Sequence, residues 1–392
     1  MSKTRIPEKT QRALWAKAGG RCEFRGCNQH LIGDLLAGRE DPMFGFLAHI
    51  VADSEDGPRG DKTLSPKLAK EMSNLMLTCA HHHRLIDTEA QDQYPVELLT
   101  QMKVDHERRL EIAGGIDDDR ASHVVRFGAN IGANEALVST RDLFAAMVPE
   151  RYPATRETID LELVGSTFTD DEPEYWALQQ TNLQRQFDAK IRGRVERQDI
   201  RHMSVFGLAP QPLLIELGRL VSDLTPTAVF QRHREPATWA WQQDQPSIEF
   251  EVGIPNGQAG GEVALLLALS ATVNVSRIES VLGPNCTVWS ITAKSPHNDI
   301  VRRPEDLSEF RRLLRQMLDR VKASHGSIER LHLFPVMPVS AAIEVGRVWM
   351  PKADLPLRIY DQNRLRGGFI STIDIFQGPG SWSPMRLGCP TN

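Results

Sequence analysis

The sequence lacks the long apolar runs of membrane proteins and the cysteine framework of small secreted ones. Its longest apolar run, Val263–Leu269 with an extension to Val275, is too short to span a bilayer, and its N-terminal residues are polar and charged. Five cysteines in 392 residues fit a reducing compartment. We therefore expect a cytoplasmic protein without membrane contact, long enough for two or three domains.

A basic excess is also missing. The net charge is −5, and residues 1–113 carry 16 Lys and Arg against 17 Asp and Glu, although residues 1–50 carry 8 against 5. Any contact with DNA would therefore depend on a small patch or on several copies of the chain acting together. The candidate patch, which could equally be a solvated helix face, comprises Arg5, Lys9, Arg12, Lys17, Arg21 and Arg25.

What the sequence does contain is a pair of cysteine–histidine clusters. Cys22 and Cys27 are separated by four residues, and Cys79 and His82 by two. Each pair can lie on one tight turn, so that four soft ligands converge on a tetrahedral zinc ion. His81 could replace His82, because the register within three consecutive histidines is ambiguous. Isolated buried cysteines are the alternative to a metal site.

Two further histidines remain once the zinc ligands are assigned. His49 lies in an expected strand over residues 46–52. His83 lies in a helix that is expected to begin at about His82, after an expected strand over residues 74–78. Beside a metal-braced turn, one imidazole can accept a proton from water while another holds a divalent cation against a phosphate oxygen. Asn74 can hydrogen-bond to the backbone and fix the loop that carries His49. The alternative is that each histidine is a satisfied surface or core residue.

This pattern resembles the HNH endonucleases, whose ββα-metal fold cleaves DNA phosphodiesters with one divalent metal ion. The resemblance implies that His49 is the general base, Asn74 the orienting residue and His83 a magnesium ligand. The segments that carry the resemblance are Cys22–Cys27, Ala48-His-Ile50, Asn74-Leu-Met-Leu-Thr-Cys79 and His82-His-Arg-Leu-Ile-Asp87.

One position departs from the family. Many members carry an acidic or histidine metal ligand directly before the base, and Ala48 stands there in this chain. Asp53 is a weak candidate for the missing magnesium ligand. Asp87, one helical turn after His83, is expected to orient that histidine.

Helices and a linker complete the expected first domain. A helix over residues 7–18, with Pro at its start and two glycines after its end, precedes the first cysteine pair. A helix over residues 96–112 closes the unit. The stretch that follows is polar and without periodicity, so we predict a first domain over 1–113, a linker over 114–123 and a second domain over 124–392.

The second domain contains an internal repeat. The block Phe206–Arg219 matches the block Phe334–Arg347 at a constant offset of 128 positions, with Phe, Pro, Ile, Glu, Gly and Arg identical. Each block follows a helical stretch and continues as strand, loop, helix and strand. We therefore predict a mostly parallel sheet and two Rossmann-like halves, around residues 178–242 and 306–361.

This region is similar to SAVED domains, which are α/β domains of two fused CARF-like halves that bind cyclic oligonucleotides. The segments that carry the similarity are His202–Pro212, His233–Trp241, Leu333–Ala342 and Leu355–Asp361. The whole chain then resembles the HNH–SAVED effectors of CBASS, the bacterial cyclic-oligonucleotide anti-phage system.

The expected ligand pocket lies where the strands of the two halves pass into helices. Backbone N–H groups at such turns suit phosphates, and Trp239 and Trp241 with Arg234 could stack on a purine. One Trp of such a pair normally faces the core, as we also expect for Phe206 and Phe334. The candidate pocket residues are Ser204, Pro210, Gln211, Arg234, Trp239, Trp241, Met337, Pro338 and Ser340.

The expected architecture is an α+β zinc-braced ββα-metal (HNH) domain followed by an α/β SAVED domain of two CARF-like Rossmannoid halves. We expect a magnesium-dependent endonuclease for duplex DNA that is activated when a cyclic di- or trinucleotide binds and the chain forms a homo-oligomer. The alternatives are a zinc-finger DNA-binding regulator with a ligand-sensing domain and a restriction-type HNH nuclease for modified DNA. The surplus histidines disfavour the first alternative, and the internal repeat disfavours the second.

Overall fold

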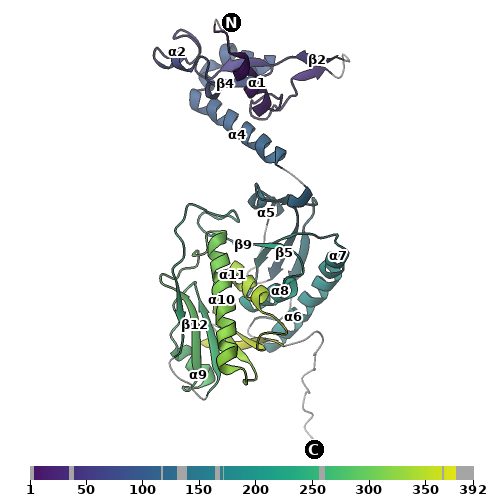
Figure 1. Ribbon diagram of the computed structural model, residues 1–392, viewed down its shortest axis with the longest axis vertical. Helices are drawn as coiled ribbons and strands as arrows, with labels where there is room; N and C mark the ends of the chain where they lie inside the picture. Colours follow the sequence, from purple (N-terminus) through teal and green to yellow (C-terminus); the bar gives the residue numbers. More distant parts are fainter. Residues whose placement is uncertain are drawn as a thin grey trace, which may run out of the picture. The chain divides into compact units, whose positions relative to one another are not determined.

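The computed structural model describes residues 4–34, 39–115, 118–129, 139–163, 168–170, 172–255, 261–363 and 366–376. The chain divides into two compact units, Met1–Asp117 and Asp118–Asn392, and each is described by itself (Figure 1). The division falls within the stretch 114–123 that the sequence predicts as a linker, although strand β5 (Ala121–Ala129) already begins there. Within the described ranges, none of the helices combines the length and the apolar character that crossing a bilayer requires.

The first unit is built around an antiparallel strand pair that leads into a helix. β3 (Phe46–His49) pairs with β4 (Leu75–Thr78), with His49 opposite Leu75, and α3 (Ala80–Arg84) follows β4 directly. The other elements are α1 (Glu8–Lys17), β1 (Ile32–Asp34), β2 (Arg39–Met43), α2 (Leu64–Leu68), the 3-10 turns η1 (Met72–Asn74) and η3 (Gln91–Gln93), the π-helical turn η2 (Leu85–Glu89) and α4 (Val96–Gly114).

The helix predicted over residues 7–18 is confirmed as α1. Pro7 precedes it, and the buried Leu14 anchors it in the core of this unit. Gly19 and Gly20 follow the helix with φ of +57° and +63°, a left-handed conformation that other residues adopt only at a cost. The two glycines therefore end the helix and turn the chain toward Cys22.

Two boundaries in this unit differ from the expectation. The strand predicted over 46–52 ends at His49, because the Asn74 side chain, rather than a neighbouring strand, bonds both backbone groups of Val51 at 2.8 Å. The helix expected from about His82 begins two residues earlier, at Ala80, and the Cys79 carbonyl accepts the N–H of His83 at 2.9 Å. All three histidines therefore lie in one helical turn.

The second unit contains two sheets and the helices around them. The elements of its first half are η4 (Asp118–Arg120), β5, α5 (Thr140–Met147), β6 (Tyr152–Pro153), β7 (Ile159–Leu163), α6 (Pro173–Phe187), η5 (Asp188–Arg192), α7 (Gly193–Glu196), β8 (Met203–Leu208), α8 (Gln211–Val221) and β9 (Thr227–Phe230). Those of its second half are β10 (Phe250–Gly253), β11 (Val263–Ala268), α9 (Ser276–Leu282), β12 (Thr287–Ala293), α10 (Pro304–His325), β13 (Leu331–Val336), α11 (Val339–Val348), β14 (Leu357–Asn363) and β15 (Gly368–Ile375).

Both sheets are mostly parallel, as the helix–strand alternation predicts. The first has the order β6-β5-β8-β9 with β7 also paired to β5, and its described pairings are all parallel. The second has the order β10-β12-β11-β13-β14-β15, and among its described pairings only the outer strands β10 and β15 run antiparallel to their neighbours. The unit is therefore an α/β domain.

The two helices of the sequence repeat, α8 and α11, pack directly against each other (Figure 1). A Cβ atom on Gly218 would lie 1.9 Å from the Ile343 carbonyl oxygen, and one on Gly346 would lie 1.9 Å from that of Ile215. Each of these residues has its counterpart 128 positions away, so the contact is reciprocal, as it is at a two-fold axis. The repeat in the sequence is thus a pseudo-two-fold seam in the structure.

The glutamate and arginine that are identical in the two blocks of the repeat also have a structural role. Glu216 is fully buried and accepts two hydrogen bonds from Arg219, at 2.7 and 2.6 Å, while Glu344 accepts one from Arg347 at 2.8 Å. A buried carboxylate needs such a partner, because removing either ion alone would leave the other uncompensated. Each Glu–Arg pair lies within one seam helix, three residues apart, and compensates the buried carboxylate of that helix.

Phe206 and Phe334 lie in the core, as expected. Both are fully buried, and they stack on Phe230 and Tyr360 with ring centroids 4.3 and 4.4 Å apart. Each pair joins the two strands on either side of a seam helix. Phe206 and Phe230 lie on β8 and β9, which flank α8, and Phe334 and Tyr360 lie on β13 and β14, which flank α11. The aromatic pairs therefore reproduce the pseudo-symmetry within the hydrophobic core.

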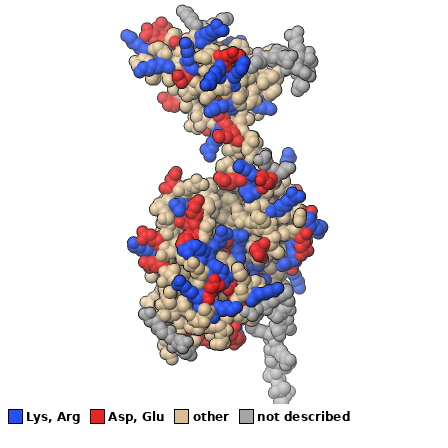
Figure 2. Space-filling view, viewed as in Figure 1, with Lys and Arg blue, Asp and Glu red and all other residues tan. Residues whose placement is uncertain are grey.

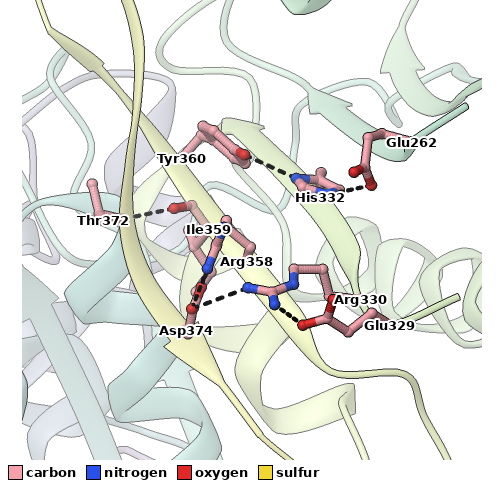
Figure 3. A network of polar contacts seen from close by, with 9 residues as sticks. All are labelled: Glu262, Glu329, Arg330, His332, Arg358, Ile359, Tyr360, Thr372 and Asp374. Carbon is pink, nitrogen blue, oxygen red and sulfur yellow. Dashed lines mark hydrogen bonds and ion pairs between the residues drawn. The ribbon is translucent and has the colours of Figure 1, made fainter. Parts of the chain in front are cut away.

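A polar network connects neighbouring strands of the second sheet, near the starts of β11, β13 and β14 and the end of the antiparallel β15 (Figure 3). The buried His332 on β13 has its Nδ1 2.8 Å from the Tyr360 hydroxyl and its Nε2 3.0 Å from the Glu262 carboxylate. Arg358 on β14 makes a two-pronged ion pair with Asp374 on β15, at 2.8 and 2.7 Å. The contacts fix β13, β14 and β15 at one edge of the sheet.

We predict that Gly218→Ala destabilises the second unit by about 3 kcal/mol, the upper end of the range for overpacking, because the new methyl group meets a backbone carbonyl that cannot move alone. Urea unfolding followed by tryptophan fluorescence measures the effect, since six of the seven tryptophans belong to this unit. Gly368→Ala is the control, because its added Cβ meets nothing within 4 Å. Equal urea midpoints for the two variants would contradict the close contact of Gly218 with the backbone of α11.

The second unit should also lose stability as the pH falls from 6.5 to about 4. Burial, with Arg151 and Arg347 adding to it, lowers the pKa of His202 from 6.5 to about 4. The unfolded chain therefore holds more protons in this interval, and the free energy of unfolding falls with pH by on the order of 3 kcal/mol for this residue. Urea midpoints at several pH values measure the slope. His202→Asn should flatten it, and an unchanged slope in this variant would refute the assignment.

Candidate functional site

Three cysteines and one histidine converge in the first unit. The ligand atoms of Cys22, Cys27, Cys79 and His82 all lie within 4.8 Å of one another. His82 Nδ1 is 3.1 Å from Cys79 Sγ and 3.7 Å from Cys22 Sγ. Ligands on one tetrahedral zinc ion, bound at about 2.0–2.3 Å, stand roughly 3.5–3.8 Å apart. The donor set and its spacing are therefore compatible with a structural zinc site.

The structure resolves the register that three consecutive histidines leave open. His82 faces the cysteines, and its other side stacks on Phe24 with ring centroids 4.0 Å apart and planes at 14°. His81 is exposed, and its ring meets His82 edge-on. The cluster therefore takes its nitrogen from His82.

The cluster lies in a buried, tightly turned segment. Burial raises the pKa of the Cys22 thiol to about 12, so an isolated thiolate would not form there, whereas a bound metal stabilises one. The turn between the first two cysteines is tight: the Cys27 N–H donates to the Phe24 carbonyl at 3.0 Å, and Gly26 has φ +84°. This geometry brings both thiols to the same side of the turn.

Glu23 joins this turn to the neighbouring strand and helix. Its backbone N–H donates to the Leu77 carbonyl at 2.8 Å, and its carboxylate accepts the Leu77 N–H at 2.5 Å. Lys103 of α4 lies 3.7 Å from the same carboxylate, and both side chains are buried. The cysteine turn, β4 and α4 are thus bound into one body.

His49 ends β3 and is 8% exposed, with Nε2 2.9 Å from the Ala69 carbonyl oxygen. Because a carbonyl oxygen can only accept, Nε2 carries the hydrogen and Nδ1 has the free lone pair. Asn74 accepts the Val51 N–H and donates to the Val51 carbonyl, both at 2.8 Å. The backbone just after His49 is therefore held in the manner expected from the sequence.

His83 lies on α3, the helix that follows β4, and its side chain is 33% exposed. Its Nε2 is 3.5 Å from Asp87 Oδ2, one helical turn later, as the spacing predicts. The exposed Phe46 of β3 lies beside it, with ring centroids 5.1 Å apart. Asp87 also bonds Arg59 at 2.7 Å, a residue that the sequence analysis did not single out.

The second magnesium ligand stays a prediction. Ala48 is buried and pairs with Met76 across the strands, and its methyl side chain has no atom that can bind a metal. Asp53 follows the strand, and its Oδ2 accepts the Thr4 N–H at 3.1 Å.

Most of the candidate pocket residues in the second unit are buried. Ser204 is fully buried, and its hydroxyl lies 2.8 Å from that of Ser122, which is also 2.8 Å from His202 Nδ1. Pro210 and Pro338 precede α8 and α11, and both are buried. Ser204 thus belongs to a network at the amino ends of the strands, away from the loop that leads into α8.

The two halves meet through glutamine side chains at the start of α11. Gln211 Oε1 accepts the N–H of the buried Met337 at 3.1 Å. Gln231 Oε1 accepts both the N–H and the hydroxyl of Ser340, at 3.1 and 2.7 Å. Gln231 is a residue that the sequence reasoning missed, and its only signal is a polar side chain directly after a strand. Amides of the first half therefore cap a helix of the second.

Trp239 and Trp241 differ in exposure, as expected of two residues that alternate along the chain. Trp239 is 2% exposed and packs edge-on against Phe206, whereas Trp241 is half-buried. Arg234 is exposed, and its N–H is bound by Asp299, which holds the loop in place. Of these residues, Arg234 and Trp241 are the more accessible to a ligand.

Residues 183–375 match the family described as "SMODS-associated and fused to various effectors sensor domain", the SAVED domain. The match covers slightly less than half of the chain and lies entirely within the second unit. The second unit therefore contains a SAVED domain, a sensor type that occurs fused to effectors. No curated protein matches the chain in sequence.

Solved structures of Cap4 SAVED/CARF-domain containing receptors resemble this chain. One, from Acinetobacter baumannii with the cyclic trinucleotide 2'3'3'-cAAA, is 13% identical, with a TM-score of 0.42 over 72% of this chain and 56% of that chain. Another, from Moraxella osloensis, is 13% identical, with a TM-score of 0.39 over 73% and 59%. This chain spans less than two thirds of the length of these structures.

We predict that the first unit carries one zinc ion per chain and that the ion depends on His82. His82→Ala and Cys79→Ser should lose zinc and lower the melting temperature of this unit, because a structural zinc ion contributes folding free energy directly. Metal analysis of purified protein and thermal melting measure the two effects. His81→Ala and Cys286→Ser are the matched controls and should keep the metal. Zinc retained in His82→Ala would refute the assignment.

Proposed function

We propose that the chain is a metal-dependent DNA endonuclease, activated when its SAVED domain binds a cyclic oligonucleotide, and that it degrades duplex DNA in anti-phage defence. The observation that carries the proposal is the union in one chain of a SAVED domain with a cysteine–histidine cluster flanked by His49, Asn74 and His83. A purely structural zinc turn has no need of two additional histidines, whereas phosphodiester hydrolysis has a use for each.

His49 is proposed as the general base. Its Nδ1 lone pair can take a proton from a water molecule, because Nε2 is already engaged with the Ala69 carbonyl. Asn74 keeps the end of β3 in place through its two hydrogen bonds to Val51. The base is thus held at a fixed orientation by a buried amide.

The proposed metals are a structural Zn²⁺ on the cysteine–histidine cluster and a Mg²⁺ held by His83, with Asp53 as the weaker second ligand. A bound magnesium ion stabilises negative charge on the phosphate oxygens. Asp87 faces His83 Nε2 and keeps that ring oriented, which leaves Nδ1 as the nitrogen for the metal.

The proposed ligand is a cyclic di- or trinucleotide, the class that the similarity to SAVED domains implies. Its proposed seat is the edge at which β8 and β13 lead into α8 and α11. Backbone donors and side-chain amides of Gln211 and Gln231 gather there, and Arg234 and Trp241 lie on a loop that follows β9. Arg234 and the Gln211 amide nitrogen can bond phosphates, and Trp241 can stack on a base. The Gln231 amide and the two N–H groups that the glutamines cap at the start of α11 already make hydrogen bonds within the protein.

Activation is proposed to proceed through homo-oligomerisation. Figure 2 shows basic and acidic side chains interspersed on the face of each unit in view. Arg12 and Arg25 of the small N-terminal patch are paired with Glu8 and Asp105. One copy should therefore hold DNA weakly, and several nuclease units together would hold it better.

The two alternatives make different predictions. A zinc-finger regulator would bind DNA without cutting it, and the pairing of His83 with Asp87 would then have no chemical purpose. A restriction-type nuclease would cut modified DNA without any ligand, and the SAVED match would then be unexplained.

We predict that the purified protein cuts plasmid DNA only with Mg²⁺ and one member of a panel of cyclic di- and trinucleotides. His49→Ala should reduce the cleavage rate by at least about 100-fold, as loss of a general base does, and leave ligand affinity unchanged. Gel electrophoresis measures cleavage, calorimetry measures ligand binding, and light scattering should show a larger assembly with ligand. Buried His106, which bonds the Ala18 carbonyl at 3.0 Å, is the histidine control, and His106→Asn should still cut.

Each outcome separates the candidates. DNA binding without cleavage under any ligand favours the regulator, and cleavage without ligand favours the restriction enzyme. A protein that cuts with ligand as an unchanged monomer would retain the nuclease proposal and exclude activation by assembly.

A further inference from the structure

Arg59 lies in a turn that is built around it. The turn follows β3, and Arg59 has a φ of +57°, the left-handed region that a branched or long side chain rarely adopts. A Cβ atom on Gly60 would lie 2.4 Å from the Glu55 carbonyl oxygen, and one on Gly57 would lie 2.6 Å from the Ala52 Cβ. The turn therefore accepts only glycine at positions 57 and 60, which enclose Pro58 and Arg59, and it holds Arg59 in a strained conformation. Strain of this kind persists only where the surroundings fix it.

The Arg59 side chain is 7% exposed and joins two segments of the candidate site. Its Nε donates to the Ile50 carbonyl at 2.7 Å, and its Nη1 donates to the Ile86 carbonyl at 2.6 Å. Its Nη2 donates to both Asp87 Oδ1, at 2.7 Å, and the His49 carbonyl, at 3.3 Å. One guanidinium group thus binds the end of the strand with His49 to the π-helical turn with Asp87.

Asp87 extends this connection to the second histidine. Its Oδ1 receives Arg59, and its Oδ2 lies 3.5 Å from His83 Nε2. A continuous series of polar contacts therefore leads from the His49 backbone through Arg59 and Asp87 to the His83 ring. Because Ala48 offers no ligand, the orientation of His83 is the more important for holding a metal ion.

We propose that Arg59 is a positioning residue that sets His83, through Asp87, against the strand end of His49. The proposal rests on the proposed nuclease function and deepens it. The geometry needs an arginine: its planar group donates in several fixed directions at once, whereas a lysine ammonium keeps the charge but cannot reach four acceptors in one plane.

The test compares Arg59→Lys with the same change at an arginine on α3, the helix that carries His83. Arg84 pairs with Glu89 at 2.7 Å, but the two side chains are 66% and 44% exposed, so Arg84→Lys is the control. The first readout is the affinity for Mn²⁺ alone, measured by electron paramagnetic resonance on the zinc-loaded protein without DNA. Arg59→Lys should weaken Mn²⁺ about 10- to 100-fold, as loss of a partner behind a metal ligand does. Arg84→Lys should leave it unchanged.

Further readouts separate positioning from a merely structural role. Zinc content should be the same in Arg59→Lys and Arg84→Lys. The melting temperature should fall in Arg59→Lys, because buried hydrogen bonds are lost, so Mn²⁺ affinity is compared at a temperature at which both variants are folded. Asp87→Asn should reproduce the Mn²⁺ effect, and the double variant should add little to it, because both residues act through one contact. In ligand-activated cleavage, Arg59→Lys should raise the Mg²⁺ concentration for half-maximal rate.

The proposal is overturned if Arg59→Lys binds Mn²⁺ like the unmodified protein, or if Mn²⁺ affinity falls only in parallel with the loss of zinc or of folded protein. If Arg59→Lys does not fold, Asp87→Asn decides in the same way. An unmodified protein that binds Mn²⁺ but cuts no DNA would refute the nuclease function and leave the positioning role standing. An unmodified protein that cuts DNA but binds no Mn²⁺ would refute the positioning role alone.

Discussion

The second unit depends on the contact between α8 and α11. At Gly218 and Gly346 each helix backbone lies against a carbonyl group of the other, an approach that any side chain would prevent. Each helix follows directly on a strand, β8 or β13, so fixing the helices also fixes the loops between strand and helix. Within each helix, an arginine three residues later compensates the buried glutamate. The edge at which a ligand is proposed to bind is therefore part of a rigid frame.

In the first unit, the short helix α3 carries one residue of the cysteine–histidine cluster and one residue of the proposed catalytic site. His82 and His83 are consecutive residues of α3, and consecutive side chains on a helix point about 100° apart. His82 therefore faces the cysteines while His83 faces Asp87 and Phe46. The helix that brings His82 to the cysteines also carries the ring that is proposed to bind magnesium.

The local features of this chain could be predicted from its sequence, and the long-range ones could not. The cysteine spacing identified the cluster, and the offset of 128 positions identified the repeat, because each is a pattern along the chain. The choice of His82 over His81 depended on how Phe24 packs, which no spacing discloses. The role of Arg59 was missed because its partners lie 9, 10, 27 and 28 positions away. The burial of Ser204 was also not predictable, because it results from the pairing of β8 with β5, where its hydrogen-bond partner lies 82 positions earlier in the chain.

The glutamine caps at α11 make the two halves of the sensor unequal. Gln211 and Gln231 bond the backbone donors of Met337 and Ser340, whereas the position matching Gln211 is Val339 and the position matching Ser340 is Pro212, which has no N–H. The seam is nearly two-fold in its backbone but not in its hydrogen-bond donors. A molecule with two identical halves would meet a different chemical surface on each side. An unsymmetrical molecule would bind in one preferred orientation, because turning it over would exchange its contacts.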